Sequence, residues 1–233
     1  MASLDLASPD KKTIQQFFDD IAVRYDFINS FLSLRLDEAW RRRARDWVWE
    51  GTEQSVLDLG IGTGKFLSLF LEGTALKKAV GLDFSEKMLL EARKKISFPV
   101  SLVSADFHFL PFRSGAFDLI LSSFTLRSVK DMPVFLKEVY RLLSAGGKAA
   151  FLCLTRPRNR FWKILYEPYL RFYLPFVGKI VSGNGEAYQF LSLSIQTFQP
   201  PDETGQMMCE SGFSSVDVHS FTGGAATLLV GRK

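Results

Sequence analysis

The sequence contains only two cysteines and two histidines among its 233 residues. Cys153 and Cys209 are far apart, and neither has the close spacing to a second cysteine or histidine that zinc ligands need. We therefore expect no metal site. Cys153 lies within the apolar run AAFLCLT, so its side chain is expected to pack in the core of a protein from a reducing compartment.

Long apolar runs and targeting signals are also missing. No uninterrupted apolar stretch reaches the roughly 20 residues of a membrane-spanning helix. The N-terminal segment MASLDLASPDKK has no basic start followed by an apolar run, so it is not expected to be a secretory signal peptide. No internal repeat and no low-complexity tract is present. A cytoplasmic protein is expected.

The composition is otherwise that of an ordinary globular protein. Hydrophobic residues make up 47% and charged residues 23%, and the length favours one domain with room for an added subdomain. The 22 phenylalanines favour a large core and also allow an apolar ligand pocket. The net charge is +4, and the basic cluster RRRAR at 41–45 indicates a solvated helix face, or alternatively a contact with nucleic acid or anionic lipid.

Residues 1–50 are predicted to form a helical region before the first strand. Apolar residues recur at helical spacing from Ile14 to Tyr25. A second helix is predicted to begin with Asp37 as its N-cap and to end at Gly51. Residues 51–233 then form the main part of a single structural domain.

From residue 51 on, the predicted strands and helices alternate. Strands are predicted at 55–60, 77–83, 100–106, 117–124 and 146–155, and helices at 65–73, 85–96 and 131–143, with Ser85 as an N-cap. Residues 156–198 interrupt this order with an aromatic and basic helical insertion, and two late strands, 214–221 and 225–232, are expected to pair antiparallel. The pattern predicts an α/β protein with a mostly parallel seven-stranded sheet, helices on both faces and an antiparallel C-terminal edge strand.

A glycine-rich loop joins the first predicted strand to the helix that follows it. Its sequence, VLDLGIGTGKF, places Gly60, Gly62 and Gly64 in alternation. Glycine is used where φ is positive or where a ligand approaches the backbone closely. Dinucleotide-binding loops instead have the spacing Gly-x-Gly-x-x-Gly, and the carboxylate of Asp58 would repel a pyrophosphate. The loop therefore favours a ligand that carries cationic groups.

Two further acids stand at the carboxyl ends of predicted strands of the same sheet. Asp83 comes 19 residues after Gly64, where a carboxylate can accept hydrogen bonds from both ribose hydroxyls. Asp106 is the last residue of the third predicted strand, where it can reach the exocyclic amine of an adenine. The backbone N–H groups near Thr63 and Gly64 can meet a ligand carboxylate at a helix N-terminus. Together with Asp58, this set favours S-adenosylmethionine over a nicotinamide dinucleotide.

Several motifs carry a resemblance to a known family. VLDLGIGTGKF, GLDFSEKML, ADFHFLPFRSGAFDLILSSFTLRSV and EVYRLLSAGGKAAFL resemble the successive motifs of Rossmann-like class I methyltransferases. The flanking segments FFDDIAVRYDFINSFLSLRLDEAWRRRA, LPFVGKIVSGNGEAYQFLSLSIQTFQPPDE and CESGFSSVDVHSFTGGAATLLVGRK resemble signatures of the ubiquinone/menaquinone biosynthesis C-methyltransferase family. The match covers about residues 14–233.

The resemblance implies methyl transfer from S-adenosylmethionine to a ring carbon of a polyprenylated quinol. Demethylmenaquinol is the favoured acceptor, and the benzoquinol of ubiquinone biosynthesis or another small phenolic or apolar acceptor remains an alternative. By motif match, the cofactor contacts fall on Thr63, Asp83, Asp106, Phe107 and Ser123, with Phe107 beside the adenine ring. These contacts join those predicted from the loop itself for Asp58, Gly60 and Gly62.

Arg127 is the expected catalytic residue, because it follows the fourth strand and a fixed positive charge there would stabilise a quinolate. The alternative role is a salt bridge to a nearby acid. Tyr188 and His108 are weaker candidates for the base, and Ser128 stands where the family usually has asparagine.

The insertion at 156–198 combines aromatic and basic residues, a mixture that suits an interfacial helix in peripheral contact with a membrane. The alternative is a lid that packs its aromatic residues on the core.

No nucleic-acid partner is expected, because the fourth strand lacks the NPPY or DPPF motif of nucleic-acid methyltransferases. A nicotinamide-linked enzyme is disfavoured by the loop spacing and Asp58, and a non-catalytic cofactor-binding scaffold is disfavoured by the intact loop and acids. The sequence does not predict the oligomeric state.

Overall fold

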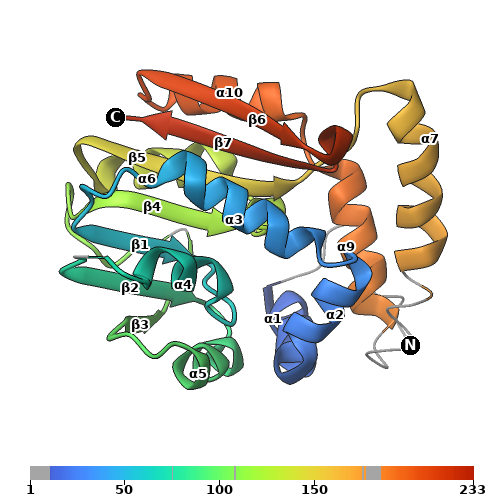
Figure 1. Cartoon of the computed structure of the whole chain (residues 1–233), viewed down its shortest axis with the longest axis horizontal. Helices are drawn as coiled ribbons and strands as arrows, with labels where there is room; N and C mark the ends of the chain where they lie inside the picture. The colour runs from blue at the N-terminus through green and yellow to red at the C-terminus, as the bar shows by residue number, and fades with distance from the viewer. Residues whose placement is uncertain (1–10, 75, 108, 175, 177–184) are drawn as a thin grey trace.

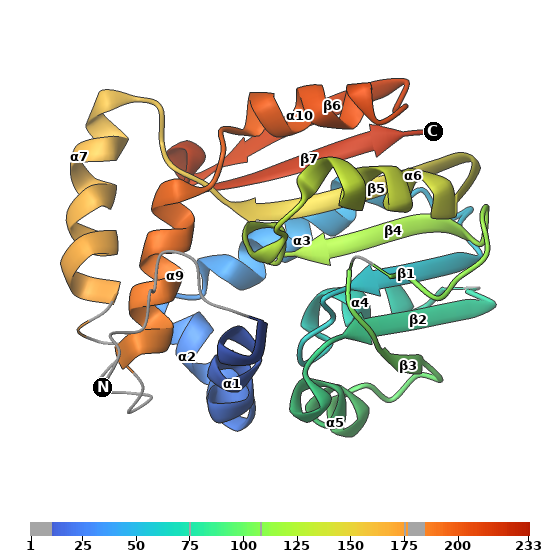
Figure 2. The same cartoon turned by 180° about the vertical axis from the view of Figure 1, so that it is seen from behind.

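A mixed sheet lies between two layers of helices, as Figure 1 and Figure 2 show from opposite sides. The computed structural model describes residues 11–74, 76–107, 109–174, 176 and 185–233. The strands are β1 Ser55–Leu59, β2 Lys78–Asp83, β3 Ser101–Ser104, β4 Phe117–Ser123, β5 Leu143–Leu154, β6 Ser215–Phe221 and β7 Ala226–Arg232. Their order in the sheet is β3-β2-β1-β4-β5-β7-β6.

The strand directions confirm the predicted fold class. β1 pairs in parallel with β2 and β4, β2 pairs in parallel with β3, and β4 pairs in parallel with β5. β7 pairs antiparallel with both β5 and β6. One detail differs from the prediction, because the antiparallel C-terminal strand lies second from the edge and β6 forms the edge itself.

The helices of the described residues precede, alternate with and follow these strands. They are α1 Lys11–Ile21, α2 Tyr25–Leu32, α3 Leu36–Val48, α4 Lys65–Leu71, α5 Glu86–Lys95, α6 Met132–Leu142, α7 Arg160–Pro168, α9 Gly185–Thr197 and α10 Pro201–Glu210. Short 3-10 turns are η1 Ala22–Arg24, η2 Leu126–Ser128 and η4 Thr222–Gly224, and the π-helical turn η3 spans Tyr169–Tyr173. The predicted helix from Ile14 to Tyr25 is thus interrupted at η1.

Each face of the sheet has its own apolar core. On one face, α3, α4 and α5 pack against β1, β4, β5 and β7, with Phe66 and Phe70 among the buried side chains. On the other face, α6 and α10 cover the sheet, with Phe135 and Met208 buried there. The sequence pattern predicts no element for residues 199–213, so α10 is an addition to the prediction.

The two predicted N-caps have different outcomes. Ser85 accepts a hydrogen bond from the backbone N–H of Met88 at 3.2 Å, as expected of the N-cap of α5. Asp37 is not the N-cap of α3, because the helix begins after Arg35, whose φ of 64° is left-handed. The Asp37 carboxylate is instead occupied within the first turn, where it accepts a hydrogen bond from Ser33 at 2.7 Å and pairs with Arg41 at 2.5 Å.

The carboxyl ends of the parallel strands form the end of the sheet where a ligand-binding site is expected. In both figures, the carboxyl ends of β1, β2 and β4 point toward α1, α2 and α9. Parallel α/β sheets bind their ligands at this end.

The prediction for the basic cluster 41–45 was wrong at one position, because Arg41 is buried while Arg42 and Arg43 are exposed. Arg41 thus faces the interior near that end rather than solvent.

Candidate functional site

The glycine loop has the backbone conformation that its spacing predicted. Gly60, Gly62 and Gly64 have φ values of 74°, 55° and 87°, which side chains with a Cβ rarely adopt. A Cβ at Gly60 would lie 2.6 Å from the side chain of Thr125, and a Cβ at Gly64 would lie 2.5 Å from Ile96. At Gly62 nothing lies within 4 Å. Close packing therefore excludes a side chain at Gly60 and at Gly64. At Gly62 the space beside the backbone is empty, so a ligand has room to approach it.

Asp83 ends β2 and holds this loop in place. Its Oδ2 accepts a hydrogen bond from the N–H of Gly62 at 2.9 Å, and its Oδ1 accepts one from the N–H of Ser85 at 3.0 Å. The side chain is buried, and this burial raises the pKa of Asp83 to about 6 in spite of the backbone hydrogen bonds. Burying the ionised carboxylate of Asp83 costs free energy. Its position beside the glycine loop is consistent with binding a ligand that donates hydrogen bonds.

Asp58 lies in β1 beneath the loop, opposite Gly81 of β2 and Leu121 of β4. Both carboxylate oxygens are buried, and neither has a hydrogen-bond partner among the described residues. Burial raises the pKa of Asp58 to about 7, whereas the nearby guanidinium of Arg41 and, more weakly, the backbone N–H of Leu67 act to lower it. A buried carboxylate is costly, and its negative charge beneath the loop favours a cationic or hydrogen-bond-donating ligand there.

A first pocket, here called the loop pocket, brings together most of the predicted cofactor residues. Gly60, Gly62, Thr63, Asp83 and Ser123 all line it. The other residues on its wall are Phe18, Tyr25, Arg41, Ile61, Lys65, Phe66, Phe84, Met88, Phe124, Thr125 and Ser128. The pocket therefore lies at the carboxyl ends of β1, β2 and β4, where the sequence placed it.

Three predicted cofactor residues lie outside the loop-pocket wall. Asp58 is buried beneath the loop. Asp106 follows β3 and is half-buried. Phe107 is buried in the core, where its ring meets that of Phe135 at a centroid distance of 5.8 Å and an angle of 69°.

The N-terminal helices supply a wall of the loop pocket that the sequence pattern did not predict. Thr63 donates a hydrogen bond from its hydroxyl to Asp26 of α2 at 2.6 Å. Ser85 does the same to Asp19 of α1 at 2.5 Å. The segment FFDDIAVRYDFINS resembles a family signature, but this resemblance did not predict the contact with the loop. The helices before the sheet thus close over the glycine loop.

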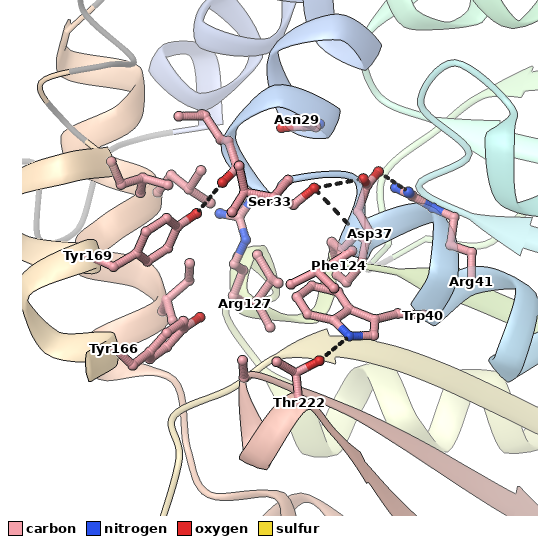
Figure 3. A pocket seen from close by; sticks show the side chains of 18 of the residues that line it. Asn29, Ser33, Asp37, Trp40, Arg41, Phe124, Arg127, Tyr166, Tyr169 and Thr222 are labelled. Atoms are coloured by element: carbon pink, nitrogen blue, oxygen red, sulfur yellow. Dashed lines mark hydrogen bonds and ion pairs between the residues drawn. The ribbon is translucent and has the colours of Figure 1, made fainter. Parts of the chain in front are cut away.

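A second pocket, here called the acceptor pocket, adjoins the first. It has a volume of about 280 Å³ and shares Phe18, Tyr25, Arg41 and Phe124 with the loop pocket. Most of its remaining wall comes from α1, α2, α3, α7, α9, the turns η2, η3 and η4, and the end of β5, and most of those side chains are apolar or aromatic. Figure 3 shows Arg127 among these side chains, with Tyr166 and Tyr169 to one side and Trp40 and Phe124 to the other.

Arg127 is the cation of the acceptor pocket that lacks an acidic partner. One guanidinium nitrogen donates to Ser194 of α9 at 2.9 Å, and Nε is buried without a hydrogen-bond partner in the described part of the chain. No described carboxylate forms an ion pair with it, so the salt bridge named as its alternative role is not seen. Burial lowers the pKa of Arg127, but a guanidinium stays charged at neutral pH. The pocket therefore presents a positive charge to its occupant.

Arg41 and Tyr25 stand at the junction of the two pockets. Arg41 is neutralised by Asp37 and lies 4.7 Å from the ring centroid of Phe124. Burial raises the pKa of the Tyr25 hydroxyl, while Arg127 and Arg41 act to lower it. Of the two weaker candidates for the base, His108 lies outside the described residues, and the side chain of Tyr188 in α9 does so as well.

Comparison with known proteins places this arrangement in a family. The model of the ubiE/COQ5 methyltransferase family matches residues 6–233. Demethylmenaquinone methyltransferase of Thermus thermophilus is 37% identical over 219 residues, which cover 93% of this chain and 99% of that protein. The ubiquinone/menaquinone biosynthesis C-methyltransferase UbiE of Geotalea uraniireducens is 35% identical over 226 residues, with 94% and 96% of the two chains covered.

The solved structures show the same fold at greater distance. A SAM-dependent methyltransferase from Thermotoga maritima superposes with a TM-score of 0.66 at 21% identity, covering 94% of this chain and 99% of that one. The predicted methyltransferase class and family are confirmed by these matches. The chain belongs to the ubiE/COQ5 methyltransferase family.

Proposed function

We propose that this protein methylates a ring carbon of a polyprenylated naphthoquinol, demethylmenaquinol, with S-adenosylmethionine as the methyl donor. The observation that carries the proposal is the buried, acid-free guanidinium of Arg127 in an aromatic pocket that adjoins the glycine loop. The names of the relatives from Thermus thermophilus and Geotalea uraniireducens support this acceptor class. The benzoquinol of ubiquinone biosynthesis is the second candidate, because the latter name includes it.

S-adenosylmethionine fits the loop pocket because of its glycine backbone and its acids. The open backbone at Gly62 and the buried carboxylate of Asp58 suit an amino acid with a cationic group. Thr63, Asp83 and Ser123 would hold the cofactor from the pocket wall. When bound, S-adenosylmethionine supplies an electrophilic methyl group on a sulfonium.

For Asp106 and Phe107 we retain the roles predicted from the motif match. The carboxylate of Asp106 would accept a hydrogen bond from the adenine amine, and Phe107 would flank the ring. Both follow β3, and the end of β3 lies beside Asp83 in the sheet, with Ser104 paired to Asp83. They are therefore close in the fold to the residue that we assign to the ribose.

The chain's own residues prepare the acceptor for attack. A quinol ring carbon becomes nucleophilic when a neighbouring hydroxyl loses its proton to solvent, and a phenol has a pKa near 10 in water. Arg127 stabilises the resulting oxyanion, since a fixed charge in an apolar pocket acts more strongly than one in water. As the ring carbon bonds to the methyl group, the bond from the methyl carbon to sulfur would break and leave a neutral thioether. The ring carbon would then lose its own proton to solvent, which restores the aromatic ring. The aromatic wall holds the ring in place and excludes water, and such positioning contributes roughly 7–11 kcal/mol in well-oriented reactions.

The acceptor is tested by turnover of radiolabelled S-adenosylmethionine with two quinols side by side under reducing conditions. We expect label in the product with a demethylnaphthoquinol, and slower or no transfer with a methoxy-benzoquinol of the same tail. Faster transfer to the benzoquinol would make the second candidate the substrate. No transfer to either quinol would contradict the proposed function.

A polyprenylated acceptor dissolves in the bilayer, and we propose that the protein contacts the membrane peripherally through the insertion at 156–198 together with the neighbouring exposed apolar side chains of α2. In the described part of the chain, no helix combines the length and hydropathy needed to cross a bilayer. Apolar side chains are nevertheless exposed on α2 and on α7, including Phe31 at 47% and Ile164 at 62%. Basic residues lie among them on α7 and η3, a mixture that suits anionic lipid surfaces.

Membrane contact predicts that the protein co-sediments with vesicles that contain anionic lipid at low salt. The double substitution Phe31→Asp and Ile164→Asp should lower the partition coefficient by about tenfold or more, because two apolar side chains are lost from the interface. Val218→Asp on the edge strand β6 is the control, since that side chain is also exposed but lies on another element. Absence of wild-type binding at low salt would contradict the membrane contact.

A further inference from the structure

The acceptor pocket is too small for a long polyprenyl chain. Its volume of about 280 Å³ lies at the lower end of small-ligand pockets, which span roughly 300–1,000 Å³. It has room for a quinol ring and the start of a tail. If the proposed substrate class is right, the rest of the tail must leave the pocket through a defined opening.

A groove on the outer side of the pocket offers such an opening. It has a volume of about 980 Å³, is more open to solvent, and shares Leu32, Leu34 and Tyr169 with the acceptor pocket. Beyond these shared residues its wall includes Phe172 and Tyr173. The groove therefore adjoins the acceptor pocket along these shared side chains, and its wall is largely apolar.

Three stacked tyrosines run along this route. The rings of Tyr166 and Tyr169 lie 5.6 Å apart at an angle of 20°, and those of Tyr169 and Tyr173 lie 5.5 Å apart at 28°. Tyr166 lines only the acceptor pocket, Tyr169 lines both spaces, and Tyr173 lines only the groove. Tyr169 and Tyr173 are the first and last residues of the π-helical turn η3, a conformation that is frequent at functional sites.

The opposite side of the opening is built by an unusual turn between α2 and α3. Leu34 and Arg35 both have left-handed φ values, 53° and 64°, which are uncommon for residues other than glycine. The turn leaves Leu34 77% exposed at the boundary of the two spaces. The Tyr169 hydroxyl donates to the carbonyl of Leu32 at 3.1 Å, so that α2 and η3 are held together at this point.

We infer that the isoprenoid tail of the acceptor leaves the pocket between Leu34 and Tyr169 and lies along the groove formed by Phe172, Tyr173 and Phe176. This inference rests on the proposed function and adds the path of the tail. Phe172 and Phe176 are 66% and 67% exposed, so an apolar chain would cover side chains that otherwise face water. The groove would thus recognise the length of the tail, while the inner pocket recognises the ring.

The test compares Phe172→Asp, which places a charge in the groove, with Phe161→Asp on α7. Phe161 is 65% exposed, nearly the same as Phe172, and lines neither the pocket nor the groove. Turnover is measured in detergent, without a bilayer, on demethylnaphthoquinols that carry one or at least four isoprene units. Circular dichroism and thermal melting confirm that both variants are folded.

We expect Phe172→Asp to raise KM for the long-tail quinol by at least about tenfold, equivalent to about 1.4 kcal/mol, and to leave KM for the short-tail quinol unchanged. Gln189→Trp, which narrows the groove from α9, should have the same selective effect. Phe161→Asp should change neither KM. Equal long-tail KM values for wild type, Phe172→Asp and Gln189→Trp would overturn the inference.

A binding measurement separates this inference from the proposed reaction. Quenching of tryptophan fluorescence by the oxidised long-tail and short-tail naphthoquinones gives dissociation constants without turnover. If Phe172→Asp selectively weakens long-tail binding in a protein that fails to methylate, the tail path stands and the proposed reaction fails. If the protein methylates both quinols and long-tail binding is the same in all variants, the reaction stands and the tail path fails.

Discussion

Replacing Arg127 by glutamine is expected to lower kcat by about 10²- to 10³-fold, the usual cost of losing one group that stabilises an oxyanion. The dissociation constant for S-adenosylmethionine should stay unchanged, because Arg127 lines the acceptor pocket and not the loop pocket. Steady-state kinetics at saturating cofactor, together with isothermal titration calorimetry, measure the two quantities separately.

Two further variants make the Arg127 prediction specific. Arg127→Lys keeps the charge and should retain more activity than the glutamine variant, although it loses the planar donor that reaches Ser194. Arg42→Gln removes an exposed arginine from α3 and should have wild-type kinetics. The pH at which kcat rises should also move upward in Arg127→Gln, since the acceptor hydroxyl ionises less readily without the cation. Full turnover in Arg127→Gln would contradict an electrostatic role.

Asp83→Asn is expected to weaken S-adenosylmethionine binding by about 100-fold. Hydrogen bonds to a charged group contribute about 1.5–3 kcal/mol each, and tenfold in affinity corresponds to about 1.4 kcal/mol. Asparagine has nearly the same volume as aspartate. Its single carbonyl oxygen can still accept a hydrogen bond from the N–H of either Gly62 or Ser85. Calorimetric titration measures the change.

The matched control for Asp83 is Asp131→Asn. Asp131 caps α6 by accepting a hydrogen bond from the N–H of Val134 at 3.0 Å, and asparagine caps a helix about as well as aspartate. Its dissociation constant for the cofactor should equal that of the wild type. An unchanged dissociation constant in Asp83→Asn would exclude Asp83 from the cofactor site.

The pH dependence of cofactor affinity gives a second readout of the same carboxylates. Burial raises the pKa of Asp83 to about 6 and that of Asp58 to about 7. A cationic ligand with hydrogen-bond donors binds the ionised forms, so affinity should rise as the pH increases from about 5 to about 7.5. Asp58→Asn should remove the part of this rise near pH 7.

The stability of the ligand-free protein should respond to these two groups in the opposite direction. A carboxyl whose pKa is raised by folding binds more protons in the folded state than in the unfolded state. Its contribution to stability is therefore full at low pH and is lost as the pH rises through the folded pKa values of about 6 and 7. Thermal melting across this pH range, with and without the cofactor, compares the two trends.

The elements that the sequence predicted well are those specified by local patterns. Gly60, Gly62 and Gly64 have positive φ, and apolar runs specify the buried strands β4 and β5, although β5 begins at Leu143 rather than at the predicted residue 146. Ser85 was identified as a cap because its side chain acts within one helical turn. In each case the deciding interaction lies within a few residues along the chain.

The features that the sequence did not predict depend on contacts between distant segments. Arg41 belongs to an ordinary basic cluster, and only the packing of α3 on the sheet buries it at the junction of the two pockets. Asp37 has the residue type of an N-cap, but its pairing with Arg41 uses the carboxylate instead. The closure of α1 and α2 over the glycine loop depends on Asp19 and Asp26, whose partners lie 66 and 37 residues further along the chain.

The most direct test of methyl transfer to a ring carbon is the position of the transferred methyl group in the product. Wild-type protein is incubated with S-adenosylmethionine that carries a ¹³C-labelled methyl group and with reduced demethylnaphthoquinol, and the product is examined by NMR and mass spectrometry. We expect a single labelled methyl group bonded to a ring carbon. Label on a quinol oxygen, or an unchanged quinol in the presence of intact cofactor binding, would contradict this expectation.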